Sequence, residues 1–394
     1  MIGRRVYVLS GFDPRGARFY HRLFSEQVRQ LQRRTGRPLQ LGHRKPSSHR
    51  KPPSQSQAST GDITQDITHD NTRDPLLSRW PVLEGGQPRL EIGFLHWDDI
   101  ARSHWPRNPL RLLWDGLGIY GWYLLGGGYR RLQRWSRRVA LCGLYPMLYA
   151  ATAALLLALA SGLLLAQGWS WPPLVTAALL LALLVGGTWQ SWRWAEAIGV
   201  VWLFRSIRFT HRLGQARDHD LRERVAALAE RLLAVEATEP AAEVWLLGHS
   251  SGSFVMAMLA AELRRRGMGS PLAQRLRLLS LGQNLANLAV HGKARRFHAD
   301  LALLAEEPRI PWLDITSRDD FLCFAGVDPY RSCGVPRDGE AYPELRLIPL
   351  AQRQGLATLV ELLSHQFDLH FEYLRTAAPE CSGGFDLIEQ LLAP

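Results

Sequence analysis

The sequence predicts an α/β protein whose mostly parallel sheet is flanked by helices and interrupted by an inserted hairpin of two transmembrane helices. Short apolar runs rich in strand-forming residues alternate with longer segments of helical periodicity, which is typical of a parallel sheet covered on both faces. The interval between Arg138 and Arg193 contains no charged residue and is dense in Leu and Ala. Its length suffices for two helices that each cross a hydrocarbon core of about 30 Å.

The overall composition indicates a basic protein that meets a membrane surface. The 394 residues carry a net charge of +11, and nearly all of the positive charge is arginine. Because many of these arginines lie beside the apolar interval, we expect an anionic membrane as the partner and not nucleic acid. The cysteines show no metal-ligand spacing, so we expect free thiols in a reducing compartment and neither a metal nor a cofactor. They are Cys142, Cys323, Cys333 and Cys381.

The first 138 residues supply one end of the predicted sheet. Residues 1–43 contain a strand near Arg5 to Ser10, a loop that begins at Gly11, and a helix that starts near Ala17. Residues 44–75 are rich in Pro, Ser, Gln, Thr and Asp with hardly any large apolar residue, which predicts a disordered linker. Residues 76–138 resume with a strand near Leu90 to Leu95, followed by an apolar segment from Leu110 to Leu125 that we expect at a membrane surface.

Residues 139–194 form the predicted hairpin. We expect one transmembrane helix near Val139 to Ala166 and a second near Leu174 to Trp192, joined by a turn with interfacial tryptophans. The turn is uncharged, whereas both outer ends are flanked by arginines, which the positive-inside rule assigns to the cytoplasm. We therefore predict an integral protein of a bacterial inner membrane with its catalytic domain on the cytoplasmic face.

The remaining segment, 195–394, contains the motif around which the chain is organised. The apolar run Val244 to Leu247 leads into Gly248-His249-Ser250-Ser251-Gly252, and a helical pattern begins at once. This strand, G-x-S-x-G and helix order predicts a sharp turn that exposes the hydroxyl of Ser250. The two glycines allow the strand and the helix to pass close to the turn. Further strands are expected at 276–281, 312–316 and 345–350.

This motif resembles the nucleophile elbow of the α/β-hydrolase superfamily, which includes serine esterases, lipases, thioesterases and acyltransferases. The resemblance implies a catalytic triad in the chain order Ser, acid, His, with each residue after a strand. For the acid, Asp320 is preferred to its neighbour Asp319 because two apolar residues follow it. For the base, His370 is preferred to His365 because its sequence context resembles the family's junction between loop and terminal helix. Ser250 would be the nucleophile.

The same resemblance implies an oxyanion hole made of two backbone N–H groups. One belongs to Ser251, directly after the nucleophile, and the other to Phe12 in the loop after the first strand. Ser10-Gly11 stands where many family members have His-Gly, so this loop departs from the family pattern. The alternative is an ordinary strand-to-helix loop in which Asp13 caps or turns the chain.

These observations predict a membrane-anchored serine hydrolase, an esterase- or lipase-like enzyme that cleaves an ester or thioester through an acyl-enzyme. The membrane location favours an apolar or lipid-like small-molecule substrate. Two alternatives are compatible with the same residues. One is an acyltransferase that uses the same triad, and the other is a catalytically inactive hydrolase-fold module that binds at the membrane.

Overall fold

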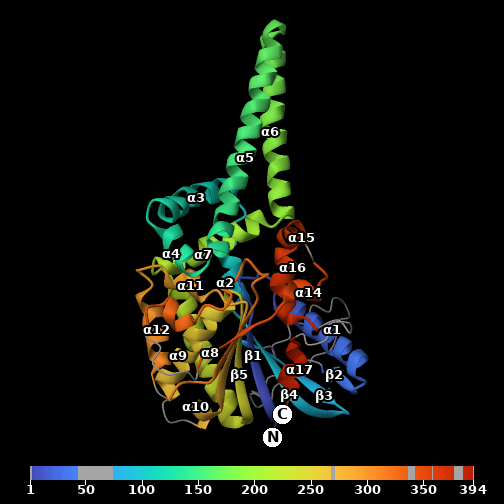
Figure 1. Ribbon diagram of the computed structural model, residues 1–394, viewed down its shortest axis with the longest axis vertical. Helices are drawn as coiled ribbons and strands as arrows, with labels where there is room; N and C mark the ends of the chain where they lie inside the picture. Colours follow the sequence, from blue (N-terminus) through green and yellow to red (C-terminus); the bar gives the residue numbers. More distant parts are fainter. Residues whose placement is uncertain are drawn as a thin grey trace, which may run out of the picture.

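The computed structural model shows a sheet domain with a long helical hairpin projecting from one end (Figure 1). Cys381 and nearly all of the predicted linker at 44–75 lie outside the described part of the chain. The described residues are 2–42, 74–267, 271–306, 308–335, 342–356, 358–376 and 385–393.

A mixed sheet forms the centre of the domain, with the strand order β2-β3-β4-β1-β5-β6-β7-β8. The strands from β4 to β8 in this order pair in parallel, which confirms the predicted mostly parallel sheet. The edge formed by β2, β3 and β4 is antiparallel, and the sequence had not indicated it. The strands are β1 Ile2–Leu9, β2 Leu39–Leu41, β3 Leu77–Glu84, β4 Gln87–Leu95, β5 Ala241–His249, β6 Leu276–Leu281, β7 Trp312–Thr316 and β8 Glu344–Leu347.

The side chains of each central strand point alternately to the two faces of the sheet, and each face has its own apolar core. In β1, Val6 and Val8 pack with α1 and α17, whereas Tyr7 and Leu9 pack with α8 and α9. Successive side chains of a strand point to opposite faces, so a strand that is apolar throughout is buried on both sides. The helices that cover the faces are α1 Ala17–Thr35, α8 His219–Thr238, α9 Gly252–Gly267, α12 Arg295–Ala305 and α17 Leu387–Leu392.

Shorter helices lie in the connections between these layers. Most of them follow the carboxyl ends of the parallel strands, which all meet at the edge of the sheet that faces the hairpin (Figure 1). They are α2 Asp98–Ser103, α10 Pro271–Arg275, α11 Leu285–Ala289, α13 Pro329–Ser332, α14 Leu350–Arg353, α15 Leu359–Ser364 and α16 Gln366–Phe371, with the 3-10 helix η2 Glu372–Leu374. Another 3-10 helix, η1 Gly168–Ser170, lies in the turn of the hairpin.

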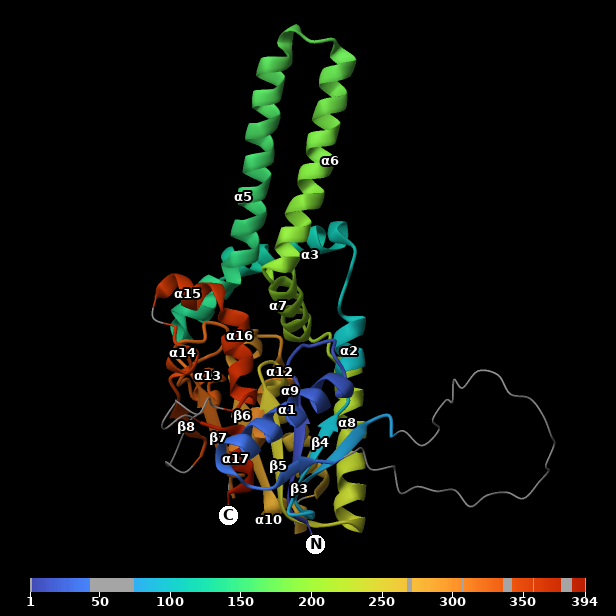
Figure 2. The same ribbon diagram turned by 90° about the vertical axis from the view of Figure 1, so that its right-hand side faces the viewer.

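The hairpin consists of α5 (Arg137–Gln167) and α6 (Pro173–Ala197), which run side by side away from the sheet (Figure 2). Both helices are long and apolar enough to cross a membrane, and the most apolar stretch of each is not buried. At their base, α3 (Pro109–Leu124), α4 (Gly128–Trp135) and α7 (Val200–Gly214) lie between the hairpin and the sheet domain. The helix α3 coincides with the segment expected at a membrane surface.

Candidate active site

Ser250 lies at a strained turn between β5 and α9. Its φ of +57° falls in the left-handed region, which a side chain with a Cβ seldom adopts. The turn is held by the Ser250 backbone N–H, which donates to the Leu281 carbonyl at 2.9 Å, and by the Ser253 hydroxyl, which donates to the Ser250 carbonyl at 2.6 Å. Bonds on both sides of the residue therefore fix a conformation that a free chain would avoid.

Two glycines make this turn possible. A Cβ on Gly252 would overlap the carbonyl oxygens of Leu9 and Ser10, and one on Gly248 would lie 2.7 Å from the Gly252 carbonyl oxygen. Both clashes involve backbone atoms, which cannot move aside without disturbing β1 or α9. The residue type at each position is therefore set by the close approach of the strand, the turn and the helix.

The structure brings Asp320 and His370 together. The carboxylate follows β7 and accepts a hydrogen bond from His370 Nδ1 at 2.8 Å. It also accepts from the Tyr373 hydroxyl at 3.1 Å and from the Leu322 backbone N–H at 2.9 Å. Burial raises the pKa of Asp320, but the nearby His370 ring and the hydrogen bonds from His370 and the Leu322 N–H outweigh that effect and hold it below its ordinary value. Asp320 is therefore an ionised acceptor, and its bond to Nδ1 favours the His370 tautomer that carries a proton on Nδ1.

The other imidazole nitrogen of His370 remains available. Nε2 is buried and has no hydrogen-bond partner among the described residues, and His370 lines the same cavity as Ser250. Because Nδ1 carries the proton, Nε2 holds a free lone pair and can accept a proton from a hydroxyl group.

The alternative acid and base lie in different surroundings. Asp319 accepts hydrogen bonds from the Ala351 backbone N–H at 3.0 Å and from the Ser317 hydroxyl at 3.3 Å. His365 is exposed, and its Nδ1 lies 2.9 Å from the Glu361 carbonyl oxygen. Neither side chain is among the described residues that line the cavity of Ser250.

His249 contacts the main chain of His370, the candidate base. Its Nε2 donates to the His370 carbonyl oxygen at 2.7 Å, which links the end of β5 to α16. Burial and the nearby His370 lower the pKa of His249 to about 3, so the ring is neutral at physiological pH. His249 therefore acts on the position of His370, and it is not among the described residues that line the cavity.

The predicted oxyanion donors lie on two loops that meet at the nucleophile. A Cβ on Gly11 would approach the Ser250 Cβ to 3.0 Å, so the loop that carries Phe12 is packed against the turn. Within the described chain, the backbone N–H groups of Phe12 and Ser251 have no hydrogen-bond acceptor. The Phe12 ring stacks on Phe209 with 4.6 Å between ring centroids, which anchors the loop. Both N–H groups are therefore unpaired within the described chain, although neither Phe12 nor Ser251 is among the described residues that line the cavity.

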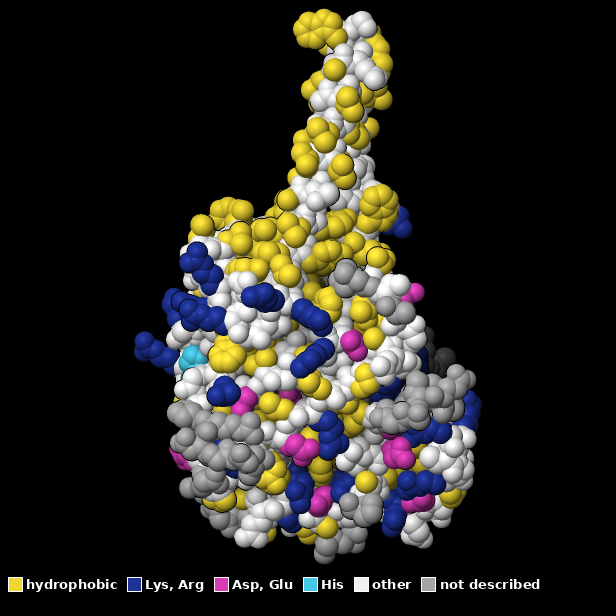
Figure 3. Space-filling model, viewed as in Figure 1, with side chains coloured by type: hydrophobic (Ala, Val, Ile, Leu, Met, Phe, Trp, Pro, Cys, Tyr) yellow, Lys and Arg dark blue, Asp and Glu magenta, His cyan; other side chains and the backbone are white. Residues whose placement is uncertain are grey.

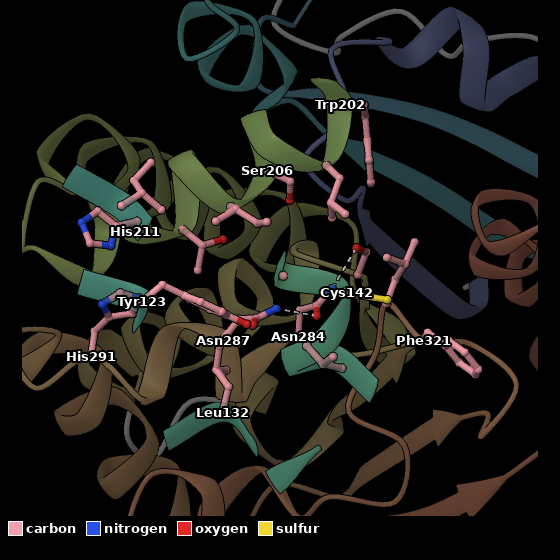
Figure 4. A pocket seen from close by; sticks show the side chains of 18 of the residues that line it. Tyr123, Leu132, Cys142, Trp202, Ser206, His211, Asn284, Asn287, His291 and Phe321 are labelled. Atoms are coloured by element: carbon pink, nitrogen blue, oxygen red, sulfur yellow. Dashed lines mark hydrogen bonds between the residues drawn. The ribbon is translucent and has the colours of Figure 1, made fainter. Parts of the chain in front are cut away.

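Asn284 is a site residue that the sequence reasoning missed. Its side-chain N–H donates to Ser250 Oγ at 3.2 Å, and its side-chain oxygen accepts from Asn287 at 2.9 Å (Figure 4, dashed lines). The Asn287 bond fixes which end of the Asn284 amide faces Ser250. Asn284 follows β6, the neighbour of β5, and a search for polar residues after each parallel strand would have found it.

The cavity lies between the strand ends and the helices at the base of the hairpin (Figure 4). Ser250, Asn284 and His370 line it, and the rest of the wall is mostly apolar. The apolar side chains come from α3, α4, α5, α7 and the loop after β7, and they are Ile119, Trp122, Tyr123, Leu132, Val139, Cys142, Trp202, Leu203, Ile207, Phe321 and Leu322.

A pair of histidines lines another part of the cavity. His291 stacks on Trp122 with 4.0 Å between ring centroids, and its ring meets His211 edge-on at 5.3 Å. Burial and then His211 and Arg131 lower the pKa of His291 to about 3, so its ring is neutral. Burial, followed by the charge of Arg217, also lowers the pKa of His211. Both shifts favour the uncharged ring, so the two histidines add polar atoms to this wall without added charge.

In comparisons with known proteins, no family model, no curated protein and no solved structure matches this chain. In the part of the chain that the structure describes, no group of three or more His, Cys, Asp or Glu side chains is arranged to hold a metal ion. The described site therefore consists of a serine hydroxyl, an imidazole with an oriented carboxylate, and free backbone N–H groups. These groups together can carry out nucleophilic acyl transfer.

Proposed function

We propose that this protein is a membrane-anchored serine hydrolase of the α/β-hydrolase type that cleaves an ester or thioester of an apolar substrate. One observation carries the proposal. Ser250, on its strained turn, shares a cavity with His370, whose Nδ1 is bonded to Asp320 and whose Nε2 has no partner among the described residues. This is the set of groups that makes a serine hydroxyl nucleophilic.

In the proposed mechanism, Ser250 Oγ attacks the carbonyl carbon while its proton passes to His370 Nε2. The carbonyl electron pair moves to oxygen, and the N–H groups of Phe12 and Ser251 bind the resulting oxyanion. Collapse of this tetrahedral intermediate breaks the bond from the carbonyl carbon to the alcohol or thiol, which leaves with the proton from His370. Water then attacks the acyl-enzyme by the same route, releasing the acid and restoring the hydroxyl of Ser250.

The hydroxyl must turn before it can react. Ser250 Oγ accepts a hydrogen bond from Asn284, and a proton transfer to His370 requires an Oγ–Nε2 bond instead. The proposed mechanism therefore includes a rotation about the Cα–Cβ bond of Ser250 that carries Oγ from Asn284 toward His370, which lines the same cavity. Asn284 therefore holds a resting position of the nucleophile, and substrate binding would favour the reactive one.

The apolar wall supports the proposed class of substrate. An acyl chain that lies against Ile119, Leu203 and Ile207 would leave water and place its carbonyl group beside Ser250. These side chains belong to helices packed at the base of the hairpin, so the cavity adjoins the segment proposed to cross the bilayer.

The proposed membrane topology follows from charge. Arg137 and Arg138 are the first residues of α5 and Arg193 lies near the carboxyl end of α6, whereas the turn between the two helices is uncharged. Under the positive-inside rule, both ends of the hairpin and the sheet domain face the cytoplasm.

A fluorophosphonate probe tests the proposal, because it phosphonylates a serine only when a base activates it. The wild-type protein should be labelled on Ser250, and Ser250→Ala should lose labelling. Ser364→Ala, which changes an exposed serine on α15, should label like the wild type. Equal labelling of Ser250→Ala and the wild type would refute the proposal. An acyltransferase would label in the same way, and product analysis with a competing alcohol or amine distinguishes it from a hydrolase.

A further inference from the structure

The helix α3 and the residue after it present a surface that the proposed reaction does not use. Large apolar side chains on α3 and just after it point outward and are 49% to 91% exposed. This surface, here called the platform, consists of Leu110, Leu113, Trp114, Leu117, Leu124 and Leu125. Soluble domains seldom expose so many large apolar side chains together, because removing each side chain from water would lower the free energy of the system.

The platform is held rigidly in this orientation. On the inner side of α3, Leu112 and Ile119 pack into a cluster with Phe204 of α7. The side chain of Asn108 caps the helix by accepting from the Leu110 backbone N–H at 2.9 Å. Asp115 forms an ion pair with Arg208 of α7. The outward apolar face is therefore a fixed feature of the fold and does not result from a loosely placed helix.

The position of the platform indicates its partner. The helix α3 runs across the base of the hairpin (Figures 1 and 2), and apolar side chains cover this region continuously up onto α5 and α6 (Figure 3). Leu141 and Leu148 of α5 are exposed in the same way, at 56% and 55%. A membrane that surrounds the hairpin would therefore meet the platform at its surface.

Charge beside the platform fits an anionic lipid. Between residues 104 and 199 the sequence has only two acidic residues, Asp115 and Glu196, and both are paired with arginines of α7. The arginines in this interval are all exposed, and Figure 3 shows several cationic side chains gathered below the apolar region. They are Arg107, Arg111, Arg130, Arg131, Arg134, Arg137, Arg138 and Arg193. Arginines next to an apolar face attract anionic headgroups while the face enters the interface.

We infer that the platform docks on the leaflet next to the catalytic domain, with anionic phospholipid as its partner. The inference rests on the membrane anchoring proposed above and adds a second contact, parallel to the bilayer surface. It also bears on the source of the substrate. Trp122 and Tyr123 of α3 and Leu132 of α4 line the catalytic cavity, so the docked helices separate this cavity from the lipid by a single layer. The substrate would then be a lipid of that leaflet.

Photocrosslinking in nanodiscs tests this docking. Benzoylphenylalanine is placed in the full-length protein at Leu117 on the platform, at Leu156 on α5, and at Gln87, an exposed residue at the start of β4 far from the hairpin. Lipid adducts are then counted by mass spectrometry. The inference predicts at least five times more lipid adduct at Leu117 than at Gln87. It also predicts a further rise at Leu117 when phosphatidylglycerol replaces part of the phosphatidylcholine.

The three positions separate the two proposals. Adducts at Leu156 with only background adducts at Leu117 would overturn the docking and leave the anchoring intact. Background adducts at all three positions would overturn both. The double variant Arg130→Gln/Arg134→Gln should remove the phosphatidylglycerol effect at Leu117 while leaving adducts at Leu156 unchanged. No rise at Leu117 with phosphatidylglycerol in the otherwise unchanged protein would refute anionic lipid as the partner, and a rise that persists in the double variant would refute the assignment of the headgroup contact to Arg130 and Arg134. These readouts do not depend on catalysis.

Discussion

Replacing Asp320 with Asn tests how the candidate base is oriented. The wild-type carboxylate accepts from His370 Nδ1 and Tyr373 through Oδ2 and from the Leu322 N–H through Oδ1. An amide has one oxygen, so it cannot serve both sides. If the oxygen keeps the Leu322 bond, the amide N–H₂ faces His370, and Nδ1 must then become an acceptor. The proton moves to Nε2, where it prevents His370 from accepting the proton of Ser250.

The expected loss is large in this arrangement. A wrong tautomer at the base typically lowers kcat by about 10⁴-fold when the orienting acid of a serine triad becomes an amide. The flipped amide keeps the correct tautomer but leaves the partly buried Leu322 N–H without its partner, which costs about 1 kcal/mol. The first arrangement is therefore favoured, and folding should be little affected because the amide occupies the same volume.

Two assays measure the effect. The rate of fluorophosphonate labelling and the hydrolysis of a p-nitrophenyl ester should both fall by about 10⁴-fold in Asp320→Asn. Asp319→Asn is the matched control, since its carboxylate bonds Ala351 and Ser317 and not His370. It should stay within about threefold of the wild type, because changes away from the site seldom exceed 0.5 kcal/mol. An Asp320→Asn protein within tenfold of the wild type, or an equal loss in Asp319→Asn, would refute this reasoning.

Three further substitutions test the nucleophile, the cavity and a buried acid. Asn284→Asp should slow labelling by about 10- to 100-fold, because its carboxylate would accept the Ser250 hydroxyl in a charge-assisted bond of about 1.5 to 3 kcal/mol; an unchanged rate would contradict the resting position. Ile207→Trp should narrow the cavity. In a series of esters of increasing chain length, kcat/KM for long chains should fall relative to short chains by about fourfold per excluded methylene. An equal loss of kcat/KM at every chain length would contradict the acyl site. Burial raises the pKa of Asp314 to about 8, so the folded state holds a proton that the unfolded state loses near its ordinary pKa of about 4. Wild-type stability should therefore fall as pH rises from about 4 to 8, and Asp314→Asn should flatten this fall in thermal unfolding curves; parallel curves would contradict it.

The sequence predicted the parts of the fold that local patterns determine. The strand, turn and helix around Ser250 depend on a short apolar run and two glycines, and the structure has them at β5 and α9. The two long apolar helices follow from a charge-free interval, and the structure has them with ends within a few residues of the prediction. The antiparallel edge was missed for two different reasons. The β3–β4 hairpin is local, with Glu84 opposite Gln87 across Gly85-Gly86, and its turn signal was overlooked. The pairing of β2 with β3 joins segments far apart in the sequence, so no local pattern indicated it.

The candidate site was also only partly predictable from local sequence patterns. Strand-end position and chain order favoured Asp320 and His370, and the structure brings these two side chains within hydrogen-bond distance. Asn284 could not be selected on chemistry, since an amide after a strand has no distinctive motif and gains meaning only beside Ser250. The cavity wall formed by α3 and α7 could not be predicted from local sequence patterns either, because it depends on how the hairpin packs against the sheet domain.

Trapping of the acyl-enzyme tests the central claim most directly. The full-length protein is quenched with acid during turnover of p-nitrophenyl decanoate, digested, and analysed by peptide mass spectrometry. The account predicts a decanoyl adduct on the peptide that contains Ser250, with the ester bond on that residue. An acyl group on another side chain, or turnover with no covalent adduct under conditions that trap a known serine esterase, would contradict it.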